Sequence, residues 1–124
     1  MARLLLIEDN EANRILVDRI LTAHGHTIRH AVDGESGIEQ AVEETFDLIL
    51  VDMGLPDIDG QTVVALLQQI PRLKTTPMVA ITAWPAEKAM ETAERYGLAG
   101  CILKPLDVAR FPEQIATFLE TGTG

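Results

Sequence analysis

The sequence is poor in cysteine, in positive charge and in long apolar runs. Its one cysteine, Cys101, excludes an intramolecular disulfide, and no cysteine or histidine stands at zinc-ligand spacing from it. Lys and Arg number 10 against 19 Asp and Glu, and the resulting net charge of -9 would repel nucleic-acid phosphates. The apolar run from Leu4 stops at Glu8, so neither a signal peptide nor a membrane span is predicted. These shortages predict a soluble cytoplasmic protein that binds neither nucleic acid nor membrane.

What the chain does have is enough apolar residues for one core. With 124 residues, 47% of them hydrophobic, it can bury a continuous core without disulfides. We predict one domain over residues 1–121 and a frayed tail over 122–124. No truncated element ends the chain, which favours a free-standing protein.

Short apolar runs alternate with helical patterns along the chain. Four runs without polar alternation predict strands buried on both faces, and a fifth, mixed segment predicts an edge strand. Between them, apolar residues recur at steps of three and four, which predicts helices. The strands are predicted at 4–7, 27–32, 48–51, 78–81 and 101–103, and the helical stripes at 16–21, 38–42, 63–70, 87–96 and 111–119. This alternation predicts a doubly wound α/β fold, a parallel sheet with helices on both faces.

Two details refine the helix predictions. Gly25 and Gly97 stand where helices should end, and Pro105 and Pro112 bound the start of the last one. The helix over 87–96 has little more than alanine on its inner face, so we expect it to be the loosest.

The residues that follow the predicted strands carry the chemistry. Ligands of open α/β sheets bind beyond the carboxyl ends of the strands, where this chain places Glu8-Asp9, Asp52, Thr82 and Lys104. Clustered carboxylates repel one another unless a cation lies between them, and Mg2+ prefers a few carboxylate oxygens together with water and phosphate oxygens. Asp52 could then attack phosphorus, with Lys104 and Thr82 stabilising charge on the phosphoryl oxygens.

The same residues resemble a response-regulator receiver domain, CheY-like and similar to single-domain regulators of the DivK type. The resemblance covers essentially the whole chain. It rests on Glu8-Asp9, Asp52-Met-Gly-Leu-Pro56 with Asp59-Gly60, Ile81-Thr-Ala83 and Lys104-Pro105. It implies a flavodoxin-like sheet of order 2-1-3-4-5 and a cis peptide bond before Pro105.

The resemblance also implies a function in a two-component phosphorelay. A sensor histidine kinase or His-phosphotransfer protein would phosphorylate Asp52, after docking near Asn13, Arg14 and Val17 and the loop after Lys104. Mg2+ would be bound by Glu8, Asp9, Asp52 and the carbonyl of Gly54. The protein would catalyse only its own phosphorylation and dephosphorylation, as a monomer or a phosphorylation-dependent dimer. Its downstream target would read the face of the fourth helix, fifth strand and fifth helix. The sequence leaves two other outputs open, onward transfer of the phosphoryl group and a role as a phosphate sink.

Two residues are expected to make the mechanism of this chain differ from that of many receivers. Cys101 stands where many receivers have a Tyr or Phe that swings inward, so we expect signalling to depend on Thr82 and on motion of the fourth helix. Trp84 and Gly54 each follow a site residue by two positions, and we expect the indole to exclude water and slow the loss of phosphate.

Three other functions compete with this prediction. An aspartate-nucleophile phosphatase would usually have a second acid at the position of Gly54, and a flavin carrier would need a phosphate loop where Glu8-Asp9 stands. A docking-only pseudo-receiver would have no use for the complete set of acids, Thr82 and Lys104.

Several other residues are expected to have structural roles and not to take part in the site. We expect turn and N-cap roles for Asp57 and Asp59, and a small buried hydrophobic role for Cys101. Surface positions are expected for His24, His26 and His30, and Trp84 alone could equally be rim packing or a partner contact.

Overall fold

The computed structural model describes residues 2–121 as one alternating β/α chain. The tail predicted for 122–124 lies outside the described residues. The elements are β1 (Arg3–Ile7), α1 (Glu11–Ala23), β2 (Thr27–Ala31), α2 (Gly34–Glu43), β3 (Leu48–Asp52), α3 (Gly60–Gln68), the 3-10 turn η1 (Pro71–Leu73), β4 (Met78–Thr82), α4 (Ala86–Tyr96), β5 (Gly100–Leu103) and α5 (Phe111–Thr121).

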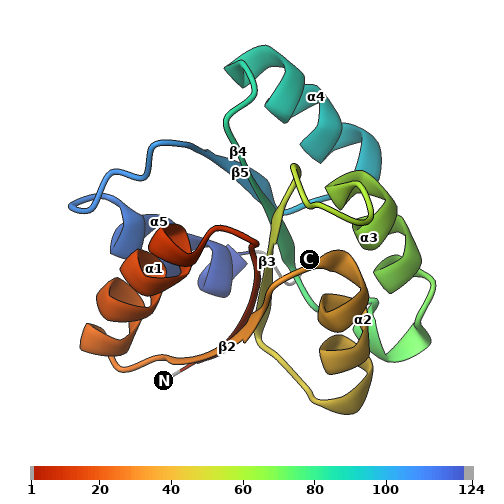
Figure 1. Cartoon of the computed structure of the whole chain (residues 1–124), viewed down its shortest axis with the longest axis horizontal. Coiled ribbons are helices and arrows are strands. Elements are labelled where there is room, and N and C mark those ends of the chain that lie inside the picture. The colour runs from red at the N-terminus through yellow and green to blue at the C-terminus, as the bar shows by residue number, and fades with distance from the viewer. Residues whose placement is uncertain (1, 122–124) are drawn as a thin grey trace.

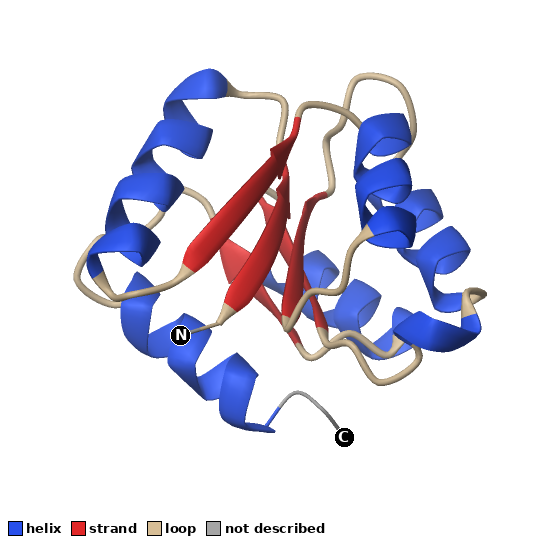
Figure 2. Cartoon of the chain, turned by 90° about the horizontal axis from the view of Figure 1, so that it is seen from below, coloured by secondary structure: helices blue, strands red, loops and turns tan. Residues whose placement is uncertain are grey.

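The strands form one parallel sheet in the order β2-β1-β3-β4-β5 (Figures 1 and 2). Figure 1 shows α1 and α5 on one face of this sheet and α2, α3 and α4 on the other. The flavodoxin-like fold and its strand order are therefore confirmed.

Burial follows the position of each strand in the sheet. Every residue of β3 and β4 is buried, because both strands have neighbours on both sides and helices on both faces. At the edge, β2 alternates exposed and partly buried residues as predicted, although it ends at Ala31 and leaves Val32 exposed. The prediction was wrong for β5, whose continuous apolar run indicated burial on both faces: it is the other edge strand, and Cys101 is partly buried and Leu103 exposed. Continuous apolar runs therefore located the strands but did not distinguish the edge strand β5 from the central ones.

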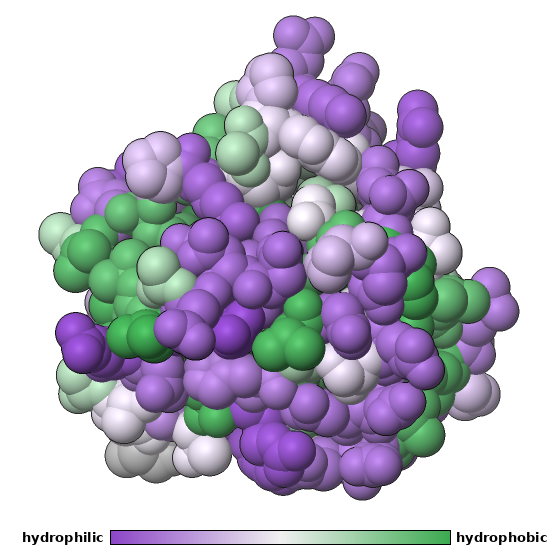
Figure 3. All heavy atoms as spheres, in the orientation of Figure 1, coloured by the Kyte–Doolittle hydropathy of each residue, from purple (hydrophilic) through white to green (hydrophobic). Residues whose placement is uncertain are grey.

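Two apolar cores fill the space between the sheet and its helices. One lies under α2, α3 and α4 and includes Val63 and Leu67, and the other lies under α1 and α5 and includes Leu21 and Phe111. The helices turn polar residues outward, and Figure 3 shows them over most of one face of the molecule, with separate apolar patches between them.

The predicted helices all exist, with local differences. Val42 was placed on the inner stripe of its helix but is 53% exposed, because α2 packs through its small residues Gly34, Gly37 and Ala41 instead. Ile70 falls after the end of α3, ahead of η1. Both predicted glycine ends are confirmed by positive φ angles, 86° at Gly25 and 66° at Gly97.

The helix α4 buries only alanines, Ala89 and Ala93, as the sequence indicated. Its expected looseness concerns motion and stays a prediction. Within residues 2–121, no helix is both long and apolar enough to cross a membrane.

Charged side chains hold α2 at both ends. At its start, the Asp57 carboxylate accepts hydrogen bonds from the backbone N–H groups of Gly34 at 2.8 Å and Glu35 at 3.0 Å. At its end, the Arg72 guanidinium donates to the carbonyls of Ala41 at 2.7 Å and Val42 at 2.6 Å. A negative charge at the N-terminus and a positive charge at the C-terminus both favour the helix dipole. The segment after β3 therefore clamps α2, and Asp57 caps this neighbouring helix in addition to lying in a turn.

Candidate functional site

The residues predicted from the strand ends do converge. Asp52 is the last residue of β3 and Thr82 the last of β4, while Glu8 directly follows β1 and Lys104 directly follows β5. Since the strands are parallel and adjacent, all of these positions lie at the carboxyl end of the sheet. They line a hollow of about 290 Å3 together with Asp9, Asn10, Asn13, Gly54, Ala83 and Trp84.

Three carboxylates meet in this hollow. One oxygen from each of Glu8, Asp9 and Asp52 lies within 4.8 Å of the other two. Glu8 is only 2% exposed and Asp52 only 5%, whereas Asp9 is open to solvent. Buried carboxylates repel one another strongly when all are ionised, and hard divalent cations prefer this kind of oxygen donor. The donor set therefore fits Mg2+.

Lys104 supplies the positive charge of the site. Its ammonium lies 3.0 Å from an oxygen of Glu8 and 3.2 Å from Oδ2 of Asp52. Burial opposes the charged ammonium, but its bonds to the two carboxylates outweigh this and raise the pKa of Lys104 above its ordinary value. Lys104 therefore stays protonated and joins the ends of β1, β3 and β5.

The two buried acids differ in protonation. Burial, reinforced by the hydrogen bond and negative charge of Asp52, raises the pKa of Glu8 from 4.5 to about 7. Burial acts in the same direction on Asp52, but hydrogen bonds from Glu8, the Gly54 N–H and Lys104 prevail and lower the pKa of Asp52. Near neutral pH the site thus holds an ionised Asp52 beside a Glu8 that can retain a proton.

The start of α1 orients Glu8. The side chain of Asn13 and the backbone N–H of Asn10 each donate to the Glu8 carboxylate at 3.3 Å, and Arg14 donates to its backbone carbonyl at 2.9 Å. Asn10 is also the N-cap of α1 and accepts from the Asn13 N–H at 3.0 Å. From the sequence, Asn13 and Arg14 were expected only to contact a docking partner. Their support of Glu8 was not predicted, although Asn13 follows Glu8-Asp9 by about one helical turn.

The loop after β3 fits closely around Asp52. Oδ1 of Asp52 accepts the Gly54 N–H at 3.1 Å. A Cβ at Gly60 would lie 2.6 Å from the Asp52 carbonyl oxygen and 2.6 Å from Cα of Met53. Only glycine lets α3 begin this close to the strand end, which explains the Asp59-Gly60 pair in structural terms.

Thr82 and Trp84 form another wall of the hollow. The Thr82 side chain is buried, and its hydroxyl accepts the Trp84 N–H at 3.0 Å. The Trp84 ring packs partly against the core under α2, α3 and α4, and the Lys88 ammonium lies 4.0 Å from the ring centroid. The indole therefore has fixed neighbours at the edge of the site.

Other predicted residues lie elsewhere. Cys101 was expected to be a buried core residue, but it is only partly buried, because it lines a second hollow on the far side of β5. Val17 was expected to contact a phosphodonor, but it is 1% exposed and packs in the core under α1. Asp59 occupies the N-cap position of α3 without a side-chain cap bond. The Lys104-Pro105 peptide bond is cis, as the resemblance implied.

The three histidines lie around β2 and its preceding turn. The His26 ring accepts the Ala2 N–H at 3.2 Å, and Nε2 of His30 lies 3.7 Å from Asp18. Among the described residues they form no metal-binding cluster, and each is at least partly exposed.

Comparison with known proteins agrees with this geometry. The profile of the response regulator receiver domain matches residues 4–116. The polar-differentiation response regulator DivK of Brucella anthropi is 32% identical over 115 residues, which cover 93% of this chain and 94% of that protein.

Solved structures share the fold. A putative response regulator from Chloroflexus aurantiacus superposes with a TM-score of 0.90 at 25% identity, covering 96% of this chain and 98% of that one. The receiver domain of a sensor histidine kinase from Pseudomonas aeruginosa, solved with a magnesium ion coordinated in its active site cleft, gives a TM-score of 0.87 at 23% identity, covering 97% and 98%.

Proposed function

Because the chain belongs to the family of response regulator receiver domains, we propose that Asp52 accepts a phosphoryl group from a phospho-histidine of a sensor kinase or phosphotransfer protein. Phosphorylation-based signalling in two-component systems is the general function of this family. The observation that carries the assignment is an ionised, buried Asp52 that shares the Lys104 ammonium with a second buried carboxylate.

Asp52 has the properties of a nucleophile. One of its oxygens accepts the Gly54 N–H and the other faces the ammonium of Lys104, so the carboxylate has a fixed orientation. In the proposed reaction an Asp52 oxygen forms a bond to phosphorus as the phosphorus–nitrogen bond to the donor histidine breaks. The electron pair of that bond returns to the imidazole, and the product is an acyl phosphate.

Mg2+ fits the carboxylate set. Glu8, Asp9, Asp52 and the carbonyl of Gly54 would bind it, and it would neutralise charge on the phosphoryl oxygens. Glu8 must lose its proton to become a ligand, which its pKa of about 7 allows near neutral pH. The magnesium ion in the Pseudomonas aeruginosa receiver supports this part of the proposal.

Lys104 and Thr82 would stabilise the product. The Lys104 ammonium already contacts Asp52 and would bind a phosphoryl oxygen without a large movement. The Thr82 hydroxyl now accepts the Trp84 N–H, and it can donate its own proton to the phosphoryl group. This new bond would favour a second arrangement of the segment from Ala83 to Cys101.

The output would leave through the face formed by α4, β5 and α5, which a downstream protein reads. The chain would act on no separate substrate and turn over only its own phosphoryl group, as a monomer or a phosphorylation-dependent dimer. The phosphodonor would dock beside the site at the start of α1, near the exposed residues around Asn13 and Arg14, and at the loop after Lys104.

The test is incubation with acetyl phosphate and Mg2+, followed by intact mass and by Trp84 fluorescence. We expect a phosphoryl adduct that requires Mg2+ and is absent from Asp52→Asn, together with a fluorescence change on the same time scale. If no adduct forms while urea melts show both proteins folded, the proposal is wrong and the chain is a docking-only pseudo-receiver.

A further inference from the structure

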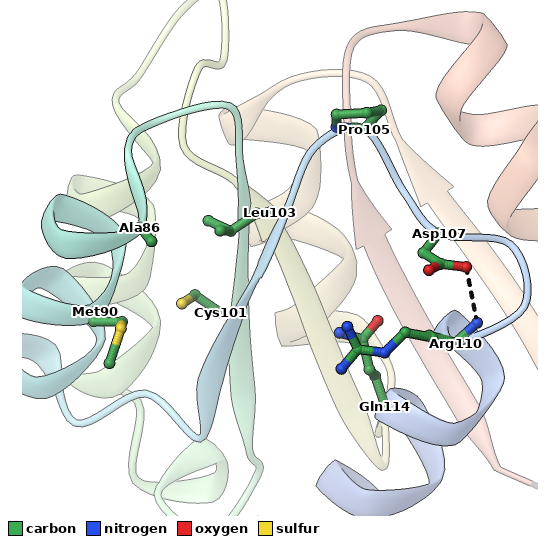
Figure 4. Close-up of a pocket in the computed structure, with 8 residues that line it drawn as sticks. All are labelled: Ala86, Met90, Cys101, Leu103, Pro105, Asp107, Arg110 and Gln114. Atoms are coloured by element: carbon green, nitrogen blue, oxygen red, sulfur yellow. Dashed lines mark hydrogen bonds between the residues drawn. The ribbon is translucent and has the colours of Figure 1, made fainter.

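A second hollow, of about 430 Å3, lies at the β5 edge of the sheet, between α4 and α5. Figure 4 shows the Cys101 and Leu103 side chains of β5 directed toward Ala86 and Met90 of α4, with Arg110 on the side of α5. Pro105, Asp107 and Gln114 complete the lining. None of these residues takes part in the carboxylate site.

The wall of this hollow is mainly apolar, and its apolar character continues outside. Met90 is 64% exposed, and Leu103 is also among the large exposed hydrophobic residues. Val108, between the lining residues Asp107 and Arg110 in sequence, is exposed as well. An apolar surface that extends beyond its hollow fits a macromolecular partner better than an enclosed small ligand. Methionine suits such a surface because its flexible side chain adapts to the group it meets.

Arg110 gives the hollow a charge preference. In the part of the chain that the structure describes, no acidic side chain pairs with its guanidinium. The one acid in the lining, Asp107, already accepts the backbone N–H groups of Ala109 at 3.0 Å and Arg110 at 3.2 Å. The free guanidinium at an apolar rim therefore favours a partner with a carboxylate.

From these observations we infer that the hollow binds a peptide segment of another protein, which inserts one apolar side chain against Met90, Cys101 and Leu103 and pairs a carboxylate with Arg110. The inference rests on the proposed function, because it names the chemistry of the partner that reads the α4-β5-α5 face. A second copy of this chain is a poorer occupant, since two chains of net charge -9 repel each other.

The hollow adjoins the carboxylate site through shared segments. Thr82, Ala83 and Trp84 line the carboxylate site, and Ala86, two residues further, lines the second hollow. Lys104 contacts Asp52, while its neighbours Leu103 and Pro105 line the second hollow. Because both connections are short stretches of backbone, a displacement of residues in the carboxylate site also moves residues that line the second hollow. Peptide binding and phosphorylation would therefore be coupled, and each would change the equilibrium of the other by the same factor.

The charge preference can be tested through Cys101, the only cysteine of the chain. The protein is equilibrated with two aromatic disulfide reagents of equal size, one bearing a carboxylate and the other an ammonium, and the mixed disulfides at Cys101 are counted by intact mass. We expect the carboxylate adduct to be favoured about two- to fivefold, and the preference to vanish in Arg110→Gln and in urea. An equal or reversed preference in the folded native chain overturns the assignment of a carboxylate to Arg110.

Peptide binding is tested with a random dodecapeptide library displayed on phage, selected on the native, unphosphorylated chain. We expect the selected peptides to share an apolar residue with an acidic residue within about one helical turn, and to bind Met90→Glu at least about tenfold more weakly. The matched control is Val42→Glu, which changes a similarly exposed residue on α2 and should bind as the native chain does.

The outcomes separate this inference from the proposed function, because neither selection nor disulfide exchange requires a phosphoryl group on Asp52. Peptides that lack acidic residues, or that bind Met90→Glu normally, overturn the inference and leave phosphorylation untouched. Failure to enrich any peptide also overturns it, and a dimer that Met90→Glu disrupts would then assign the face to a second copy.

Discussion

At the scale of single residues, the site depends on an unequal division of protons between two adjacent carboxyl groups. Glu8 is held by Asn10, Asn13 and Lys104 and has a pKa of about 7, whereas Asp52 has a lowered pKa and stays ionised. This inequality leaves the nucleophile charged while limiting the repulsion that two buried negative charges would cause.

The raised pKa of Glu8 predicts a pH-dependent stability in metal-free buffer. Between the ordinary pKa of 4.5 and the folded value of about 7, the folded chain binds a proton that the unfolded chain releases. The free energy of unfolding should therefore fall as the pH rises from about 5 to about 8, by roughly 2 kcal/mol. Asp52 does not contribute in this window, because its pKa lies below 3.8 in the folded state.

Urea unfolding curves at each pH, followed by circular dichroism, measure this effect. Glu8→Gln has a side chain of similar size that does not titrate, so most of the decline should disappear. His26 remains in both proteins; burial lowers its pKa, and it opposes the decline equally in both. A slope that persists unchanged in Glu8→Gln would assign the effect to another group.

Trp84 should control how long the phosphoryl group survives. Its ring lies at the edge of the hollow, packed on the core and covered by Lys88, where it can restrict access of water. We expect the acyl phosphate to decay several-fold faster in Trp84→Asn, measured by intact mass after removal of acetyl phosphate. Lys88→Ala should leave the ring in place and change the decay less. Unchanged or slower decay in Trp84→Asn would exclude shielding.

At the scale of elements, α2 depends on side chains from the segment that follows β3. Arg72 binds the carbonyl groups at the end of α2, and Asp57 binds the N–H groups at its start. Removing the guanidinium leaves these carbonyls to water and removes a favourable charge from the end of the helix. Arg72→Ala should therefore lower the free energy of unfolding by about 1 kcal/mol. Lys74→Ala, in the same segment, is the control and should have almost no effect in urea melts.

The link between Thr82 and α4 should operate without an aromatic ring at position 101. Cys101 lies in a different hollow from Thr82, while Trp84 contacts Thr82 directly and precedes α4 by two residues. Cys101→Ala should therefore keep the fluorescence change that follows phosphorylation, and Thr82→Ala should lose most of it while still accepting the phosphoryl group. Loss of the change in Cys101→Ala, with normal phosphorylation, would show that the thiol itself transmits the signal.

The element scale also shows what the sequence could and could not predict. Continuous apolar runs identified β1, β3, β4 and β5, and a mixed segment identified β2. The site followed from the residues after the apolar runs. The inward face of α2 was misjudged, since packing through glycine and alanine leaves a weak hydrophobic pattern. The contacts of Asp57 and Arg72 were missed because they join segments distant in the sequence, and that of Asn13 because it depends on side-chain orientation; periodicity reports neither.

At the scale of the whole molecule, the site is formed jointly by the carboxyl ends of several strands. Four strand ends deliver polar groups to the same rim, Glu8 and Asp9 after β1 and one group each at the ends of β3, β4 and β5. No one element contains enough of them to bind a cation and orient a phosphoryl group. Function is therefore coupled to correct folding of nearly the whole chain, from Glu8 to Lys104.

The contacts of Asp57 and Arg72 with α2 suggest where the chain can be divided for protein engineering. Contacts from Asp57 and Arg72 join β3, α3 and η1 to α2, whereas α4, β5 and α5 lie beyond this joined part. A chimera that keeps residues 1–82 and takes the rest from a relative would leave both ends of the clamp intact. Such an exchange should transfer the choice of downstream partner as a block while preserving most of the groups that receive the phosphoryl group, so new signalling connections could arise by recombination at this boundary.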